Sequence, residues 1–449
     1  MKAAAQKVYK ADNSGPYRKP HPRSNVAPHN RVDYLTHNSL IRGFMGAGLL
    51  PAFNRYQRIF TTQLVSTLNE HQQVNGWISM PDIHQFFRDN LGRSVVESFF
   101  GPLLLKTNPT FMQELWEFDD ATPSLSKRLP RWLIPRAYRV RDSLLGQILA
   151  WYENARAQFK DSLIDTDGNG DPCWGSEMMR ERQEFLLAVD GQDDESLASS
   201  DLGLIWVSVT NLVPSVMMMA LHVFADPVLL RRLRKSLRDV MTIKKDAVDG
   251  EAAQVRIDMD RAIKNPLLQA VYAETLRLHV QAFVTRSSAH ESVSINQWWL
   301  EQEKVVMVNS YPNHMDKKSW NEGLNGVHPV ETFWPDRFLR DPADPQSGPM
   351  RVKTASEKMT ETANEPFFSL SGLEGMWIPY GGGTSACPGR VFAKRVMLYT
   401  CAYLVSHFDI DIQADWEMDS SSFGLGTQKP KGKVPFAIRR RSLPLEEMQ

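Results

Sequence analysis

The sequence predicts a mainly α-helical protein with a small β region placed late in the chain. Apolar residues recur every three or four positions from about residue 50 to 188 and again from about 199 to 278, the spacing of helices that bury one face. Short runs rich in β-branched residues, typical of strands, follow only after residue 280. The chain has 449 residues, 42% of them hydrophobic, which is enough for one large core.

Glycine and proline divide the helical part into separate segments, because both disfavour helix interiors. The breakers are Gly101-Pro102, Pro123, Pro130, Pro135 and the loop 165–172. The apolar pattern between them predicts helices over residues 56–68, 83–100, 111–118, 143–159, 178–188, 199–224, 228–241 and 265–278. Pro266 falls near the first turn of the last of these helices, where a missing N–H costs little.

The rest of the chain is predicted to be strand, loop and one further helix. Strands are expected over residues 283–288, 292–295 and 304–310, followed by a loop-rich stretch over 320–376. A helix over 389–407 and a small hairpin at 434–438 end the pattern. Residues 1–45 are interpreted as an irregular N-terminal segment with a short helix at 3–9, and residues 46–449 as one domain.

Charge and cysteine content exclude several classes of protein. Lys plus Arg and Asp plus Glu both number 52, so no nucleic-acid partner is expected. The three cysteines, Cys173, Cys387 and Cys401, form no CxxC pair. This sparse, odd set argues against a disulfide framework or a structural zinc site and fits a reducing compartment.

No signal peptide or membrane-spanning segment is expected. The first fifteen residues, MKAAAQKVYKADNSG, lack an apolar core. The most apolar run, residues 212–224, is interrupted by Pro214 and His222 and falls short of the roughly 18 apolar residues of a spanning helix. The chain is therefore expected to be soluble or peripheral to a membrane.

The segment around Cys387 carries the clearest chemical signal. The glycines at 381–383 allow tight turns with no side chain over a cofactor, and Cys387 comes just before a predicted helix. Backbone N–H groups at a helix start stabilise a thiolate, which suits either a metal ligand or a nucleophile. The alternative is a buried structural cysteine after a glycine turn.

The run Tyr380-x-x-Gly383-x-x-x-Cys387-x-Gly389 resembles the haem-binding loop of the cytochrome P-450 family, Phe-x-x-Gly-x-Arg-x-Cys-x-Gly. Tyr380 stands where Phe is usual, and Ser385 where a propionate-binding Arg is usual. The version here is similar to a fungal branch related to cholesterol 7α-hydroxylase and prostacyclin synthase, in which Ser is expected. The resemblance implies the P-450 fold, with an apparently shortened N-terminal part, and a haem (iron protoporphyrin IX) whose axial ligand is the Cys387 thiolate.

Further motifs follow in the family's order. Glu274 and Arg277 lie three apart on a predicted helix, so the two charges can pair. Alone, such a pair is more often a solvated helix pair. Arg337, in a Pro-Asp-Arg-Phe run, matches the third member of the family's buried triad, which supports the haem. Arg286 matches a propionate ligand, with an ordinary strand-edge arginine as the alternative.

The predicted long helix departs from the family's usual acid–alcohol pair. Asn211 replaces the acid and Leu212 occupies the alcohol position. Trp206, Asn211 and Pro214 are similar to the cholesterol 7α-hydroxylase and prostacyclin synthase branch. Protons for oxygen chemistry could pass through Thr210, Asn211 or ordered water. The alternative is that Thr210 and Asn211 only make local helix contacts.

Four weaker signals complete the pattern. Arg55 or Arg58 is a candidate for the other propionate, and the loop Asp165–Asp171 is like a calcium loop but lacks its final glutamate. Residues 127–141 mix arginines with apolar residues and suit either an anionic membrane surface or a solvated helix boundary. Basic residues after the cysteine suit docking of an acidic electron donor. They are Arg390, Lys394 and Arg395.

Three hypotheses result. The first is a haem-thiolate monooxygenase that hydroxylates or otherwise oxidises a small lipophilic secondary metabolite, such as a terpenoid or steroid-like scaffold. By the resemblance it takes electrons from an NADPH-cytochrome reductase and lies at the cytoplasmic side of the endoplasmic reticulum, in peripheral contact with the membrane. The second is an oxygen-independent haem-thiolate isomerase or dehydratase. The third is a non-catalytic relic that binds haem weakly.

Overall fold

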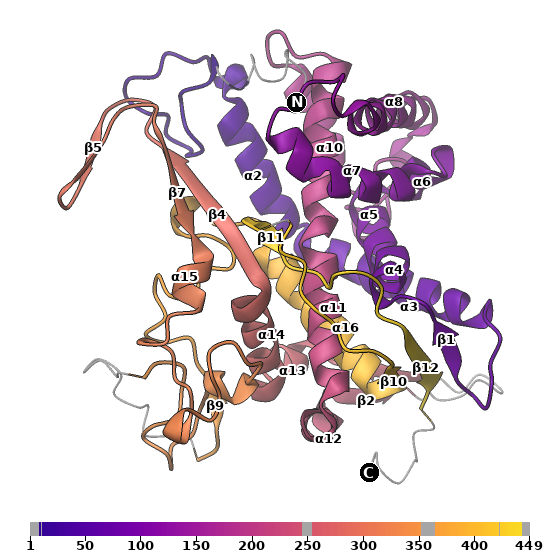
Figure 1. The fold of residues 1–449 in the computed structure, drawn as a ribbon. Coiled ribbons are helices and arrows are strands. Elements are labelled where there is room, and N and C mark those ends of the chain that lie inside the picture. The colour runs from indigo at the N-terminus through magenta and orange to yellow at the C-terminus, as the bar shows by residue number, and fades with distance from the viewer. Residues whose placement is uncertain (1–8, 10, 245–253, 352–363, 422, 442–449) are drawn as a thin grey trace.

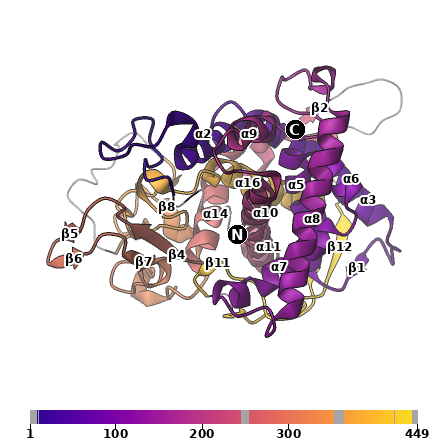
Figure 2. The same cartoon turned by 90° about the horizontal axis from the view of Figure 1, so that it is seen from above.

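The computed structural model describes residues 9, 11–244, 254–351, 364–421 and 423–441. Helices make up most of this part of the chain, as the sequence predicts, and the strands are short (Figure 1). Seen from above, α8 (Pro135–Gln158) runs along one side of the molecule, and β4 (Val280–Ser287) and β7 (Val305–Asn309) lie on the opposite side (Figure 2). The long central helices lie between them.

Most of the other helices match predicted segments, but those at residues 32–44, 102–107, 259–262 and 310–314 were not predicted. Before the centre the other helices are α2 (Val32–Phe44), α3 (Leu49–Asn69), α4 (Ile83–Phe87), α5 (Arg93–Phe100), α6 (Pro102–Thr107), α7 (Phe111–Ser126) and α9 (Glu177–Leu187). From the centre onward they are α10 (Asp194–Thr210), α11 (Leu212–Ala225), α12 (Pro227–Ser236), α13 (Met259–Ala262), α14 (Pro266–His279), α15 (Ser310–His314) and α16 (Arg390–His407).

The strands form small antiparallel sheets. One sheet has the order β1 (Ile78–Met80), β12 (Phe436–Arg440), β10 (Phe408–Ile412), and another the order β11 (Leu425–Thr427), β4, β7. Two-stranded pairs are made by β2 (Met241–Lys244) with β3 (Gln254–Ile257), β5 (Val293–Ile295) with β6 (Trp298–Leu300), and β8 (Leu339–Arg340) with β9 (Phe367–Phe368). The β4–β7 register places Val284 opposite Val308.

Several predicted boundaries were wrong. The N-terminal segment is not irregular throughout, because Val32–Phe44 is helical, whereas most of the short helix expected at 3–9 falls outside the described residues. Pro123 does not end α7, which continues to Ser126. The strand near residue 434 is not part of a small hairpin, because β12 pairs with both β1 and β10.

Side chains at the helix starts explain why several helices begin where they do. Asp193 accepts a hydrogen bond from Ser196 N at the start of α10, and Asn265 accepts from Leu268 N at the start of α14. Such caps satisfy backbone N–H groups that have no partner within the helix. The predicted position of Pro266 in the first turn of α14 is confirmed.

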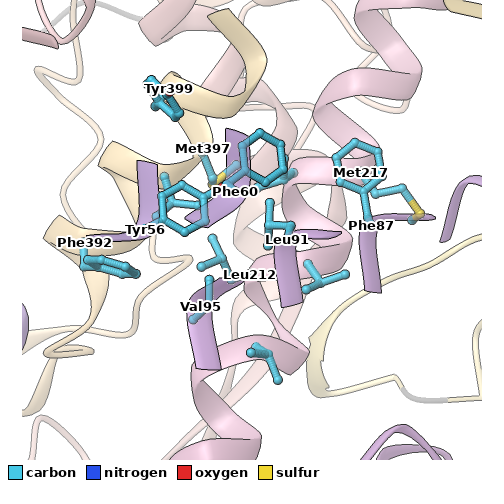
Figure 3. Close-up of a cluster of buried hydrophobic side chains, with 14 of the residues drawn as sticks. Tyr56, Phe60, Phe87, Leu91, Val95, Leu212, Met217, Phe392, Met397 and Tyr399 are labelled. Atoms are coloured by element: carbon cyan, nitrogen blue, oxygen red, sulfur yellow. The ribbon is translucent and has the colours of Figure 1, made fainter. Parts of the chain in front are cut away.

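The core lies where α3, α5, α11 and α16 meet (Figure 3). Tyr56 and Phe60 of α3 stack with ring centroids 5.6 Å apart, and Phe392 of α16 meets Tyr56 edge-on. Leu212 belongs to this cluster and is only 6% exposed (Figure 3). The core therefore fixes α11 and α16, the two helices that flank the predicted site.

The central helix is interrupted at Asn211, which divides α10 from α11. Taken together, Asp194–Ala225 is long and apolar enough to cross a membrane by length and composition, but 67% of its most apolar window is buried inside the protein. A mostly buried core helix meets the same criteria, so this stretch alone is weak evidence for a membrane span.

Candidate active site

Cys387 sits in a tight turn immediately before α16. Its backbone N–H donates to Tyr380 O at 2.9 Å, which closes the loop that contains Gly381 and Gly383. Both glycines adopt positive φ, 72° and 67°, a conformation that side chains disfavour. The glycine run is therefore required by the backbone of this loop.

Opposing effects act on the pKa of the Cys387 thiol. Burial raises its pKa, while hydrogen bonds from the backbone N–H groups of Gly389 and Arg390 and the charge of Arg390 act in the opposite direction. The predicted contacts with the helix start are therefore present, but the pKa of the free thiol still lies above its usual value. Such a sulfur is better suited to bind a metal cation, which stabilises the thiolate, than to act as a free nucleophile.

The space beside the loop can accept a flat cofactor. A β-carbon added to Gly382 or Gly383 would meet no atom within 4 Å, and one added to Gly381 would meet only Val284 of β4. A cysteine before a helix, glycines without side chains and open space beside them fit a haem bound through sulfur. Among the described residues, no group of three or more His, Cys, Asp or Glu suggests another metal site.

Arg286 of β4 reaches the same loop. Its guanidinium donates to Gly382 O and to Thr285 O, both at 2.8 Å, and the residue is exposed. The sequence placed Arg286 on a strand near the cysteine loop, and the structure brings the two together. Ser385, where the family motif usually has an arginine, is exposed in the turn Gly383–Ser385.

Two tyrosines lie behind the loop. Tyr272 of α14 donates a hydrogen bond to the Tyr380 hydroxyl at 3.0 Å. Burial raises the pKa of both phenols, and the nearby negative charge of Cys387 raises them further. Both hydroxyls therefore stay protonated at neutral pH. The sequence motif indicated Tyr380 but gave no reason to select Tyr272.

The predicted triad forms a fully buried ionic cluster. Arg277 donates to both carboxylate oxygens of Glu274, at 2.7 and 2.8 Å, and Arg337 Nε lies 3.3 Å from Glu274 Oε1. Burial alone would raise the pKa of Glu274, but the two guanidiniums bring it below its usual value. Trp334 N adds a hydrogen bond to the same carboxylate at 3.0 Å. The carboxylate offsets one of the two positive charges, and the cluster as a whole keeps a net charge of +1 that must be stabilised by further hydrogen bonds.

Backbone carbonyl groups accept hydrogen bonds from the guanidinium N–H groups of the two arginines that do not face Glu274. Arg277 donates to His314 O at 2.8 Å and to Val330 O at 2.7 Å. Arg337 donates to Asn321 O and, at 3.2 Å, to Pro329 O. The triad thus fixes the long irregular stretch that precedes the cysteine loop.

Three histidines near the triad, the buried His279 and His314 and the half-buried His222, were not identified as site residues from the sequence, because no motif singles them out. Burial lowers the pKa of His314 and of His222 to about 4 each, and lowers that of His279 well below its usual value. His222 and His279 share one hydrogen bond between their Nε2 atoms at 2.7 Å. All three rings are therefore neutral in the folded protein at neutral pH.

The predicted oxygen-side residues lie at the break in the central helix. Asn211 Oδ1 accepts from Thr427 N of β11 at 2.9 Å, and Thr210 Oγ1 is buried with no hydrogen-bond partner among the described residues. Leu212 belongs to the buried apolar core. The structure therefore groups these residues at one break, next to β11.

Arg55 does not fit the expectation that it holds a propionate. It is buried and donates to Ser98 O at 3.0 Å and to Asn169 Oδ1 at 2.9 Å. Asn169 lies in the loop that is like a calcium site, where Arg180 also pairs with Asp171 at 2.5 Å. Guanidinium groups therefore neutralise this acidic loop, in place of a metal ion.

The basic residues beyond Cys387 are partly buried and have partners inside the protein. Lys394 donates to Gln269 Oε1 at 2.8 Å and lies over the Tyr272 ring. Arg390 donates to Cys387 O at 2.9 Å, and Arg395 lies over Phe53. These side chains pack the cysteine loop against α14 and α3.

This combination defines a class of protein: a helical fold in which a cysteine before a buried helix is prepared to bind haem iron, supported by a buried Glu–Arg–Arg cluster. A family model described as "Cytochrome P450" matches residues 51–436. The chain belongs to the cytochrome P450 family.

Named relatives agree with this assignment. The chain is 33% identical over 415 residues to "Cytochrome P450 monooxygenase efuG" of Hormonema carpetanum, covering 92% of this chain and 73% of that protein. It is 32% identical to "Cytochrome P450 monooxygenase fsoE" of Humicola fuscoatra, covering 92% and 71%. It is 21% identical to "Cholesterol 7-alpha-monooxygenase" of Cricetulus griseus, covering 73% and 58%.

A solved structure supports the fold. The crystal structure of a cytochrome P450 (CYP102L1) superposes with a TM-score of 0.58 at 17% identity, over 98% of this chain and 84% of that one. Together, the family and the named monooxygenases identify this chain as an oxidoreductase of the monooxygenase type. Haem is its expected cofactor, and the family implies a redox partner.

Proposed function

We propose that this monooxygenase hydroxylates or otherwise oxidises a small lipophilic secondary metabolite, such as a terpenoid or steroid-like scaffold. The observation that carries this proposal is the apolar wall beside the cysteine loop. Val284 of β4 lies next to Gly381, whereas Phe283 before it on the strand points to the other face, against Gly424 and Phe423. Apolar walls with few polar groups are typical of sites for lipophilic ligands. One relative is named for cholesterol, which is a lipophilic sterol.

The proposed roles of the residues follow from their positions. Cys387 supplies the axial thiolate, and Gly381 and Gly383 keep the loop free of side chains over the cofactor. Bound haem would supply oxygen activation, with electron density pushed from the thiolate. Arg286 is close enough to the loop for its guanidinium to pair with a propionate carboxylate, a geometry that arginine suits well.

The remaining proposed residues hold the loop or face the oxygen side. Glu274, Arg277 and Arg337 keep the segment before the loop in place through their carbonyl contacts. Tyr380 contributes its carbonyl oxygen to the turn at Cys387. Thr210 and Asn211 contribute polar groups beside a leucine, Leu212, that cannot donate a proton.

The proposed partner is an NADPH-cytochrome reductase at the cytoplasmic side of the endoplasmic reticulum. A surface near the membrane is suggested by the connection between α7 and α8, where Trp132 is 80% and Leu133 is 52% exposed. Arg128 and Arg131 lie in the same connection. Exposed tryptophan beside basic residues is typical of segments that touch an anionic bilayer surface.

A second candidate function is supported by one observation. Leu212 occupies the position where the family's alcohol usually stands, and its side chain is packed into the core. The alternative for an enzyme without that hydroxyl is rearrangement of a peroxide without oxygen, as an isomerase or dehydratase. Anaerobic incubation with a lipid hydroperoxide, without reductase, would give rearranged product only in that case.

The first test is the reduced, carbon-monoxide difference spectrum of the purified protein beside the Cys387→Ser variant. We expect a thiolate-type Soret band that the variant loses, because serine offers no thiolate. A matched control is Cys401→Ser, a buried cysteine on α16, which should retain the band. Absence of a haem band in the wild type would favour a non-catalytic relic, and a band retained in Cys387→Ser would contradict the ligand assignment.

The reaction itself is tested next with a reductase, NADPH and a panel of terpenoid and steroid probes. Oxygen-dependent, NADPH-dependent products from lipophilic members of the panel would support the proposal. Products from polar probes alone would contradict the proposed substrate class while leaving the monooxygenase assignment intact.

A further inference from the structure

A small polar cavity lies beside the break in the central helix. It has a volume of about 40 Å³ and is bordered by α7, α10, α11 and the segment around β11. Trp206, Asn211 and Pro214, the three central-helix residues that resemble one branch of the family, all line it. These three residues therefore form part of the cavity wall.

Asp119 of α7 is the main acidic group in the cavity wall. Trp206 Nε1 donates a hydrogen bond to Asp119 Oδ1 at 3.0 Å, and the Asp119 side chain is 20% exposed. Lys429 Nζ lies 3.8 Å from Asp119 Oδ2 and 2.8 Å from Oδ1 of Asp120, which is 56% exposed. Asp119 lies in the cavity lining and is itself partly exposed, so it reaches solvent at this end of the cavity, whereas Asp120 lies outside the lining.

Thr210 lines the same cavity beside Asn211. Its hydroxyl oxygen is buried and has no hydrogen-bond partner among the described residues, although it lies in the cavity lining. Buried hydroxyl groups are almost always satisfied, either by protein atoms or by water. A cavity of this volume with polar walls holds a few water molecules but is far too small for a lipophilic substrate.

The charges around the cavity argue against binding of a dissolved ion. Asp119 and Asp419 would repel an anion, while Lys429 in the wall and Arg88, 3.5 Å from Asp120, already supply cations. His84 also lines the wall, and burial and these cations lower its pKa to about 2, so it stays neutral. Water is the occupant that meets all of these groups.

We propose that this cavity is a water-filled proton inlet and that Asp119 is its proton-carrying residue, replacing the alcohol that Leu212 lacks. The inference rests on the proposed monooxygenase function, because reducing oxygen with electrons from NADPH also consumes protons. The protonated Asp119 carboxyl gives its proton to a cavity water, which passes one on towards Thr210 and Asn211. The carboxylate then regains a proton from solvent at the exposed end, so that the net change is one proton taken from bulk water.

The environment of Asp119 suits this task. Burial raises its pKa, and Asp120 raises it further, while Lys429 and the Trp206 hydrogen bond act in the opposite direction. A carboxyl group whose pKa moves towards neutrality can both hold and release a proton under working conditions. The indole N–H of Trp206 keeps the carboxylate pointed at the cavity.

Asp119→Asn is the decisive variant, because asparagine keeps a hydrogen-bond acceptor for Trp206 but cannot carry a proton. The first measurement follows the Trp206 indole N–H resonance by NMR as pH is varied, with Trp206→Phe to assign it. We expect a titration above the usual carboxyl range that disappears in Asp119→Asn. A pH-independent resonance in the wild type would overturn the assignment of Asp119.

The second measurement is oxygen consumption with reductase and NADPH, in H₂O and in D₂O. We expect Asp119→Asn to be three- to tenfold slower, with a larger solvent isotope effect and an unchanged carbon-monoxide band. Glu117→Gln, on the same helix but outside the cavity lining and paired with Arg136, is the matched control and should behave like the wild type. If Asp119→Asn and the wild type show equal rates and equal isotope effects, the proton inlet is overturned but the monooxygenase function is not. No reductase-dependent consumption by the wild type would instead overturn the monooxygenase, and the inlet with it.

Discussion

The ring of His314 accepts a hydrogen bond from the backbone N–H of Ile378 at 3.1 Å. The carbonyl oxygen of His314 accepts from Arg277 at 2.8 Å. One residue on the short helix α15 therefore connects the buried triad to the segment that leads into the cysteine loop. Its second ring nitrogen lies 3.2 Å from Val280 O, so Nδ1 carries the proton and Nε2 is the acceptor.

Replacing His314 with alanine should loosen the cysteine loop. The substitution leaves Ile378 N–H without its acceptor in a buried site, which costs about 1–3 kcal/mol. We expect faster loss of haem to an apo-myoglobin trap and a lower urea midpoint. The control is His71→Ala. His71 is exposed and lies just beyond the end of α3, so its replacement should change neither the rate of haem loss nor the urea midpoint. Unchanged haem retention in His314→Ala would show that the loop does not depend on this bond.

The buried triad should be far more sensitive to substitution than an exposed ion pair. Glu274→Gln removes the one carboxylate that the two buried guanidiniums share, so we expect a loss of about 3–5 kcal/mol in the free energy of unfolding. Asp336→Asn breaks the partly exposed pair with Arg232, 2.6 Å long, and should cost no more than about 1 kcal/mol. Urea unfolding of the two variants beside the wild type checks the difference, and similar costs would contradict it.

Buried histidines should make the protein acid-labile. Burial lowers the pKa of His222 and His314 from about 6.5 to about 4, so the folded state keeps them neutral while the unfolded state takes up protons. Their contribution is fully present above pH 6.5 or so and is lost as pH falls towards 4. For His314 the full loss of stability, reached once pH is below both pKa values, is roughly 3 kcal/mol.

This dependence is measured as the free energy of unfolding in urea at several pH values between 7.5 and 4.5. His314→Gln keeps an acceptor for Ile378 but does not titrate, so its stability should fall less steeply on acidification than that of the wild type. Parallel pH profiles for the two proteins would show that His314 is not one of the groups responsible.

The sequence predicted the parts of the site that rest on local patterns. Cys387 and the glycines around it are adjacent in the chain, and Glu274 and Arg277 share one helix face, so spacing alone predicted that each set lies together. Their roles at a haem site came from the family resemblance. Arg337 joined them only through the family resemblance. The helical class could be predicted because the apolar period is regular from α3 through α14.

The parts that could not be predicted depend on contacts between distant segments. The pair His222–His279 and the bond from Ile378 to His314 join residues far apart in the chain, with no motif at either end. Arg55 failed as a propionate candidate because its actual partner, Asn169, lies more than a hundred residues away. Pro123 failed as a helix end because packing of α7 outweighs the lost backbone hydrogen bond.

Arg286 should matter for cofactor binding more than for the fold. Its side chain is exposed and bonds only to carbonyl groups of the loop and its own strand, so Arg286→Ala should change stability little. If it pairs with a propionate, haem affinity should fall several-fold, and Arg286→Lys should recover part of it, because lysine keeps the charge without the paired donors. Haem titration of the apoprotein measures this, and equal affinities in all three proteins would contradict the propionate role.

Introducing a hydroxyl at position 212 tests whether this position can take part in proton delivery. Leu212 is 6% exposed in the core, so Leu212→Thr removes packed volume and should destabilise the protein by about 1–3 kcal/mol. Leu212→Val removes similar volume without adding a hydroxyl and is therefore the matched control. In the reductase system we expect the threonine variant to release less hydrogen peroxide per NADPH oxidised than the valine variant, because a hydroxyl at the alcohol position adds a second route for protons. If the two variants release equal amounts, position 212 does not take part in proton delivery, and the polar groups at Thr210 and Asn211 must carry it in both.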